Sequence, residues 1–524
     1  MVRFYKNPLW AAMGPIPVVG TGKNFLLLSS LLLILIGLNK HFAWVPEIIF
    51  LIPILLFIVT SFISGSPISR LLSIILVVFT PFEYLAYIIP FLYIPRVLLS
   101  RHNSRLSKSI KFFLLLLLCW VLIDWGVSQV RELNLLSLVL FFITFLSPFI
   151  VMVGISMERI SWREVELLSH AFIRFSLLQL IPVLVGQIFR KDWFPGDSNF
   201  GSLRSTNEIA LIMIVALTVI LFDRSRRISN ITSWREGVLI PSIGCAYLLF
   251  ESETKHLLIS LIIAGFLYII IRIIASKKLP IKTKILFSGS LVFGSLFIAF
   301  ITPYVGNLYI KYLVGDENRT LQDYLATYTD PNHKLVFAQR ILSRDYPWLI
   351  GAGPGTISSK ASNSRASDTM YKEQGSRLFN LVEPFTSKLA KEYYVDLYDE
   401  EWAVQAQWRS AALTNPFSSH LAIIAELGIM GWWLVASLYL SMVLSAEGLK
   451  TGDSRKDSII VAGQVCALLI FVASLFDTYM EVAQFMLVTI LFVGLPYASL
   501  KPMVSIRSRI KVIENNIDGQ YGTV

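Results

Sequence analysis

Residues 421–444 read LAIIAELGIMGWWLVASLYLSMVL, an apolar run long enough to cross the roughly 30 Å of hydrocarbon in a membrane. A second such run, residues 285–305, reads ILFSGSLVFGSLFIAFITPYV. Neither run contains Lys, Arg or Asp, whereas residues 306–420 between them have the composition of ordinary water-soluble sequence. The sequence therefore predicts a membrane protein in which one large polar loop is set between two spans.

The composition of the whole chain supports this interpretation. Of its 524 residues, 55% are hydrophobic and 15% are charged, against about 25% charged residues in soluble domains. The formal net charge of +11 could indicate a nucleic-acid partner, but the basic residues cluster in short loops between apolar runs. That pattern is typical of membrane orientation, so we expect membrane lipids and no nucleic acid among the partners.

Apolar runs recur along the chain and predict an all-α polytopic integral membrane protein with about 13 to 14 transmembrane helices. The number depends on residues 68–94, where Pro81 and Glu83 interrupt the run. This stretch is either two short helices or one kinked span. The runs are residues 25–38, 46–63, 68–79, 82–94, 110–125, 133–155, 167–189, 209–222, 238–250, 257–274, 285–305, 421–444, 458–475 and 482–498.

Basic loops predict the orientation of these helices. Any two of the Lys- and Arg-rich loops are separated by an even number of apolar runs, so all of them belong on one face, which we assign to the cytoplasm. The polar segments 190–208, 251–256 and 306–420 then share the external face. The basic loops are residues 96–111, 223–236, 272–284, 455–456 and 501–511.

The chain accordingly divides into four parts. Residues 1–305 are predicted to form an N-terminal transmembrane bundle, 306–420 a mainly helical extracytoplasmic cap loop, 421–500 C-terminal transmembrane helices, and 501–524 a cytoplasmic tail. Within the cap loop, Gly351-Ala-Gly-Pro-Gly355 is glycine-rich, but no Gly-Lys-Ser/Thr follows it. We therefore expect a structural turn there and no nucleotide site.

Four cations are predicted near the external ends of helices. Arg204 and Lys255 each precede an apolar run, and Lys334 and Arg340 lie early in the cap loop. Positive charge on the external side runs against the usual bias, which suggests that an anion is bound there. A lipid-linked diphosphate at the membrane interface is one such anion. The alternative is that these side chains only reach lipid headgroups.

His420 stands at the entrance of the 421–444 run. A histidine there could act as a general base, because its unperturbed pKa of about 6.5 is close to neutral pH. The alternative is a polar group that caps the helix. Glu426 lies deeper in the run, so we expect it to pair within the bundle.

Polar residues inside the apolar runs keep a different class of protein open. His170 and Arg174 share a helical face, and Glu83, Asp124 and Asp477 are isolated acids. Such groups usually face a cavity or one another. A transporter of lipid-linked glycans or small anions is therefore the rival hypothesis, although no pair of broken helices in two symmetric halves is evident.

Four motifs together resemble the O-antigen ligase and Wzy-type polysaccharide polymerase superfamily. The resemblance lies in their order around one large loop and covers residues 199–433. The motifs are Leu203-Arg-Ser-Thr-Asn-Glu-Ile-Ala210, Ser252-Glu-Thr-Lys-His256, Tyr346-Pro-Trp-Leu-Ile-Gly-Ala-Gly-Pro-Gly355 and Ser419-His-Leu followed by Ala425-Glu-Leu-Gly-Ile-Met-Gly431.

The resemblance implies a metal-independent glycosyltransferase without a cofactor, which uses undecaprenyl-diphosphate-linked oligosaccharides outside the bacterial cytoplasmic membrane. The implied activity is polymerisation of O-antigen or exopolysaccharide repeats, or, as an alternative, ligation of the glycan to another acceptor. The implied partner proteins are a flippase and a chain-length regulator. Thr254-Lys255 stands where the family has Ser-Arg, and the usual loop histidine would fall near Phe417.

The resemblance also implies roles for the candidate residues. The cations Arg204, Lys255 and Arg340, with Lys334 beside them, would hold the donor diphosphate. His420 would be the base, with His333 and Glu373 in the cap loop as alternatives, because His420 is displaced from the family's usual position.

Overall fold

The computed structural model describes residues 21–63, 65–99, 104–128, 135–190, 201–203, 206–225, 234–251, 255–275, 349–356, 359, 418–475 and 479–499. Throughout these ranges the regular structure is helical, with no strand. Among the described residues, six helices or continuous helical segments are long and apolar enough to span a membrane, and five shorter apolar helices accompany them. The architecture is that of a helical polytopic membrane protein, as predicted.

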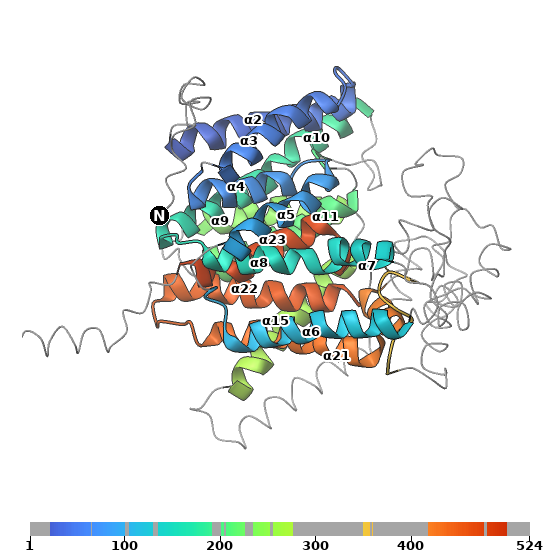
Figure 1. Ribbon diagram of the computed structural model, residues 1–524. Coiled ribbons are helices and arrows are strands. Elements are labelled where there is room, and N and C mark those ends of the chain that lie inside the picture. Colours follow the sequence, from blue (N-terminus) through green and yellow to red (C-terminus); the bar gives the residue numbers. More distant parts are fainter. Residues whose placement is uncertain are drawn as a thin grey trace, which may run out of the picture.

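The helices run roughly parallel and antiparallel to one another in one bundle (Figure 1). In chain order the elements are α2 (Thr21–Phe42), α3 (Ile48–Ile63), α4 (Pro67–Val78), α5 (Glu83–Leu99), α6 (Lys108–Ser128), α7 (Leu135–Phe141), the π-helical turn η1 (Phe142–Leu146), α8 (Ser147–Met157), α9 (Trp162–Leu178), α10 (Leu180–Arg190), α11 (Thr206–Val219), η2 (Ile220–Arg224), η3 (Arg235–Leu239), α14 (Ile240–Glu251), α15 (Lys255–Ala275), α21 (Ser419–Glu447), α22 (Ser454–Ala473), η6 (Tyr479–Glu481) and α23 (Ala483–Ala498).

Each predicted apolar run coincides with a helix or with consecutive helical segments, except residues 285–305, which lie outside the described ranges. The open question at residues 68–94 is settled in favour of two helices, α4 and α5. They are antiparallel, because Arg70 at the start of α4 and Arg96 at the end of α5 both bond to Glu158. Helix α4 begins with Ser66 as its N-cap and Pro67 in its first turn, a sequence that favours a new helix start.

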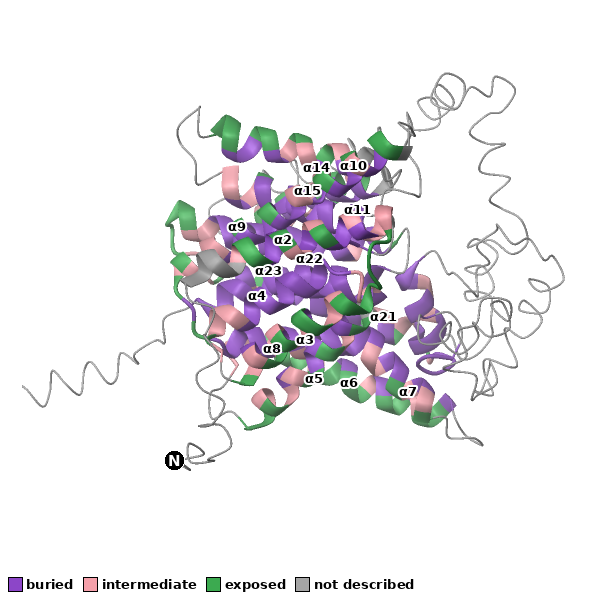
Figure 2. Ribbon diagram, turned by 90° about the horizontal axis from the view of Figure 1, so that it is seen from above, coloured by how far each residue is buried: buried purple, intermediate pink, exposed green. Residues whose placement is uncertain are grey.

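Two C-terminal helices form the centre of the bundle. Every residue of α23 is buried, and most of α22 is buried as well. Figure 2 shows both among the buried interior, with exposed residues on the peripheral helices. A helix that is apolar on all sides is suited to such a central position. On the periphery, α3 and α6 expose large apolar side chains, as a lipid-facing surface would.

The described residues of the basic loops lie at one end of the bundle, here called the Glu158 end. Ser107, next to α6, bonds to Ser445 of α21 at 2.7 Å, and Arg105 donates to the carbonyl oxygen of Ala498 at 3.0 Å. The cytoplasmic assignment of these loops rests on charge alone, but their common position is confirmed for the residues described. Two further bonds at this end join Lys450 to Tyr268 and Ser458 to Asp223.

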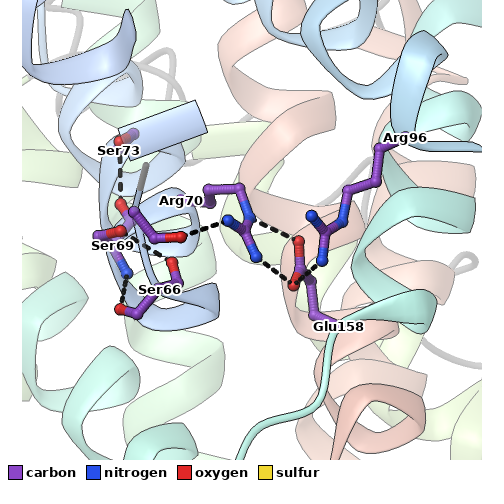
Figure 3. Close-up of polar contacts among 7 residues, drawn as sticks. Ser66, Ser69, Arg70, Ser73, Arg96 and Glu158 are labelled. Carbon is purple, nitrogen blue, oxygen red and sulfur yellow. Dashed lines mark hydrogen bonds and ion pairs between the residues drawn. The ribbon is translucent and has the colours of Figure 1, made fainter. Parts of the chain in front are cut away.

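A cluster of charged side chains around the buried Glu158 lies at the Glu158 end (Figure 3). The Arg70 guanidinium binds both carboxylate oxygens of Glu158 at 2.8 Å, and Arg96 adds a third bond at 2.9 Å. Glu158 is fully buried, and a planar guanidinium fork satisfies its carboxylate well. The cluster ties α4, α5 and the C-terminal cap of α8 together.

The opposite end, here called the His420 end, joins α21 to α22, η6 and α23. Ser418 Oγ donates to the carbonyl oxygen of Ser474 at 3.2 Å, and the Met480 amide donates to Ser419 Oγ at 3.1 Å. The starts of α11 and α15 belong to this end, because their far ends make the Asp223 and Tyr268 contacts at the Glu158 end.

Candidate functional site

Helix α21 is broken at Gly428, in the first half of its length. This residue has φ 70° and ψ −179°, a conformation that side-chain-bearing residues rarely adopt and glycine adopts readily. A break of this kind removes helical partners from nearby carbonyl groups, which must then find other donors inside a membrane. Gly428 therefore marks a place where α21 departs from a regular membrane-spanning helix.

The glycine segment, residues 349–356, supplies those donors. The amides of Ala352 and Gly353 donate to the carbonyl oxygens of Ala425 and Glu426, both at 2.9 Å. A Cβ atom at Gly351 would lie 1.9 Å from the carbonyl oxygen of Glu426, so only glycine permits this approach. The predicted structural turn is thus present, and it packs against the break in α21.

An indole group satisfies the next carbonyl along the break. Trp120 of α6 donates through Nε1 to the carbonyl oxygen of Leu427 at 2.8 Å. The polar edge of this tryptophan therefore joins two membrane helices at the depth where α21 is irregular. Sequence reasoning missed Trp120, because nothing in an apolar run distinguishes a tryptophan with a buried hydrogen bond from one at the lipid surface.

Two buried carboxylates bind the backbone of the same segment. Glu426 accepts from the Gly355 amide at 2.7 Å and from the Ser359 amide at 2.9 Å, one bond at each carboxylate oxygen. Asp124 of α6 accepts from the Gly351 amide at 2.7 Å. The sequence predicts that Glu426 pairs within the bundle; in the structure, the amides of Gly355 and Ser359, which donate to its carboxylate, belong to the segment 306–420.

His420 lies in the first turn of α21 and is only 3% exposed. Trp432 donates through Nε1 to Nδ1 of His420 at 2.8 Å, and Nε2 lies 2.7 Å from the carbonyl oxygen of Phe471. An indole nitrogen only donates and a carbonyl oxygen only accepts, so these contacts fix a neutral ring protonated on Nε2. In this arrangement neither ring nitrogen is open to a substrate hydroxyl.

Most of the predicted binding cations lie outside the described residues, namely Arg204, Lys334 and Arg340. The alternative bases His333 and Glu373 also lie outside them. Lys255 is described only as the first residue of α15, which places its backbone at the His420 end.

The residues just before Arg204 are fixed in place. Leu203 is fully buried, and its carbonyl oxygen accepts from Lys40 of α2. Ser202 Oγ donates to the carbonyl oxygen of Phe79 at 2.6 Å, and its amide donates to Gln179 Oε1 at 2.7 Å. Ser202 and Leu203, the two residues before Arg204, are therefore held in place beside the starts of α10 and α11.

Among the polar residues that suggested a transporter, some are exposed and one is buried. His170 and Arg174 are both exposed on α9. Asp124 is buried and bonds to the glycine segment. The side chain of Glu83 and all of Asp477 lie outside the described residues.

No group of three or more His, Cys, Asp or Glu residues suited to a metal ion occurs in the part of the chain that the structure describes. No protein-family model matches this chain, and no curated protein matches it. The resemblance to the polymerase and ligase superfamily therefore stays a prediction that rests on its four motifs.

Proposed function

We propose that this protein is a polysaccharide polymerase of the Wzy type. It would join undecaprenyl-diphosphate-linked oligosaccharide repeats on the outer face of the bacterial cytoplasmic membrane. The observation that supports the proposal is that the described residues of the four motifs lie at one end of the bundle. Leu203, the start of α15, the glycine segment and His420 all belong to the His420 end.

The proposed reaction is a glycosyl transfer between two lipid-linked glycans. A hydroxyl oxygen of the acceptor sugar attacks the anomeric carbon of the donor, and the bond from that carbon to the diphosphate oxygen breaks. The hydroxyl proton passes to a base, and undecaprenyl diphosphate leaves as an anion. Arg204, Lys255, Lys334 and Arg340 would stabilise the negative charge on that leaving group without a metal ion.

The identity of the base decides which loop residues carry the chemistry. His420 is the predicted base, but its hydrogen bonds to Trp432 and Phe471 favour a role in positioning α21. His333 and Glu373 are the alternatives in the cap loop. A base must come within hydrogen-bond reach of the acceptor hydroxyl, so a residue of the loop that binds the acceptor is well suited.

A ligase would share the donor site and differ only in its acceptor. A transporter is the rival hypothesis, and the feature that motivates it is the pair His170 and Arg174, which are exposed on α9. A flippase and a chain-length regulator are the expected partner proteins of a polymerase.

The surface-glycan profile of cells that lack the protein tests the proposal. A polymerase predicts loss of long chains, with single lipid-linked repeats accumulating outside the cytoplasmic membrane. A ligase predicts long lipid-linked chains that are not transferred, and a flippase predicts single repeats accumulating inside. Re-expression of the wild-type chain should restore the long glycan. Unchanged long glycan in the deletion strain would contradict the proposal.

A further inference from the structure

Three of the hydrogen bonds that residues 349–359 donate to α21 are accepted by one residue, Glu426. Glu426 uses its carbonyl oxygen for the Gly353 amide and its two carboxylate oxygens for the amides of Gly355 and Ser359. One residue thus accepts three bonds from seven consecutive residues of the large polar segment. Glu426 is fully buried, so each bond forms in a medium of low dielectric constant, where a charged acceptor is strong.

The break in α21 and the segment depend on each other. A Cβ atom at Gly428 would lie 2.2 Å from the carbonyl oxygen of Leu349, and one at Gly351 would overlap the carbonyl group of Glu426. The backbone of the glycine segment therefore packs directly against the backbone of α21, with a glycine on each side of the contact. Such close packing sets the position of the segment along the helix, because a shift in either direction would leave buried amides and carbonyls without partners.

We infer that Glu426 is a positioning residue that holds the glycine segment and Ser359 at a fixed place on the membrane bundle. Arg340 lies eleven residues before Gly351, so the contact limits where that predicted cation can go relative to the helix ends. The catalytic consequence rests on the proposed function, but the docking of the segment does not. Loss of this anchor should leave the bundle folded and the segment detached.

Thiol labelling tests the docking directly. Ser359 is 1% exposed and bonds to Glu426 through its backbone, so Ser359→Cys can report on the contact without removing it. The measurement is the rate at which a bulky water-soluble maleimide labels this cysteine in detergent-purified, full-length protein carrying Cys119→Ala. Adding Glu426→Gln replaces one carboxylate oxygen with an NH2 group that faces an amide donor. We expect labelling to accelerate by at least about tenfold, since charge-assisted bonds are lost.

Two controls separate local release from general loosening. Glu447→Gln makes the same chemical change at the far end of α21, where the carboxylate binds Gln464 and Lys450, so it should leave labelling slow. The native Cys245 and Cys466 are buried and should stay unlabelled in every variant that keeps its fold. An unchanged rate at position 359 in Glu426→Gln would overturn the inference, and so would equal acceleration by Glu447→Gln.

A second variant keeps the test decisive if Glu426→Gln fails to fold. Gly351→Ala disturbs the same contact from the segment side and leaves α21 unaltered, so it should accelerate labelling in the same way. Slow labelling in a folded Gly351→Ala protein would contradict the inference.

Glycan analysis then addresses catalysis separately. If the Glu426→Gln protein is labelled rapidly and makes less long glycan, Glu426 positions the segment for the proposed reaction. Rapid labelling with normal long glycan would confirm docking but refute its catalytic consequence. If the deletion strain itself makes normal long glycan, the proposed function fails while the labelling result stands.

Discussion

Trp432 donates its indole N–H to Nδ1 of His420 at 2.8 Å, across the break in α21 at Gly428. The bond takes the lone pair that a general base would need, while Nε2 faces the Phe471 carbonyl oxygen at 2.7 Å. His420 thus connects the first turn of α21 with both the body of that helix and the end of α22. The geometry favours a structural role, and the base assignment can be tested against it.

His420→Gln should retain most polymer synthesis if this role is correct. Glutamine can accept from the Trp432 indole and donate to the Phe471 carbonyl, as the neutral imidazole does. His420→Ala should instead lower stability by about 1–3 kcal/mol, because it leaves two buried polar groups unpaired. Glycan length and the thermal denaturation midpoint measure the two effects.

The opposite outcome would restore His420 as the base. In that case a folded His420→Gln protein should be slowed by roughly 10²- to 10⁴-fold in turnover, since glutamine cannot accept the proton. The variants His333→Gln and Glu373→Gln belong in the same experiment. A turnover loss confined to one of them would identify the base in the cap loop.

Arg204→Ala should abolish long glycan while the protein remains in the membrane. Loss of one charge-assisted contact to a bound diphosphate costs about 2–4 kcal/mol, or roughly 30- to 1000-fold in rate. Arg174→Ala is the matched control, because Arg174 is exposed on α9 and is not part of the proposed site. Long glycan of normal length from a correctly inserted Arg204→Ala protein would exclude Arg204 from donor binding.

The orientation of the bundle predicts the behaviour of reporter fusions. An enzyme that is active only outside the cytoplasm should be active when fused after Ser364, in the large polar segment. It should be silent when fused after Ser454, at the start of α22, because the basic loops share that end. Activity after Ser454 would reverse the assigned orientation of every helix.

Glu158→Gln should strongly destabilise the bundle. Removing the buried anion leaves Arg70 and Arg96 facing each other without a counter-charge, which typically costs about 3–5 kcal/mol. The matched control is Glu164→Gln in the capping box of α9, where only a cap contact changes and the expected loss is about 1 kcal/mol or less. Equal denaturation midpoints for the two variants would contradict a stabilising role of the cluster.

Arg70 and Arg96 should differ in their contributions. Arg70 is 7% exposed and makes two bonds to Glu158, whereas Arg96 is 35% exposed and makes one. Arg70→Lys should therefore lower the denaturation midpoint more than Arg96→Lys, because lysine cannot reproduce a two-bond fork. A larger effect at Arg96 would show that solvent exposure does not weaken this contact as expected.

Much of the fold follows from the sequence alone. Helix positions could be predicted because backbone polar groups inside a membrane must be paired, and a long apolar run meets this requirement by forming a helix, which pairs them within its own segment. The grouping of the basic loops at one end could be predicted for a similar reason, since each crossing reverses the direction of the chain. Even the separation of α4 from α5 was visible as an alternative, through Pro81 and Glu83.

The partners of buried polar groups were decided by the tertiary structure. Nothing near Glu158 in the sequence indicates that Arg70, 88 residues earlier, will bind it. The sequence also could not show that the acid in the Ala425–Gly431 motif holds the amides of Gly355 and Ser359. Hydrophobic periodicity reports which face of a helix is apolar, but a hydrogen bond depends on the positions of two distant atoms, and only the packed chain brings those together.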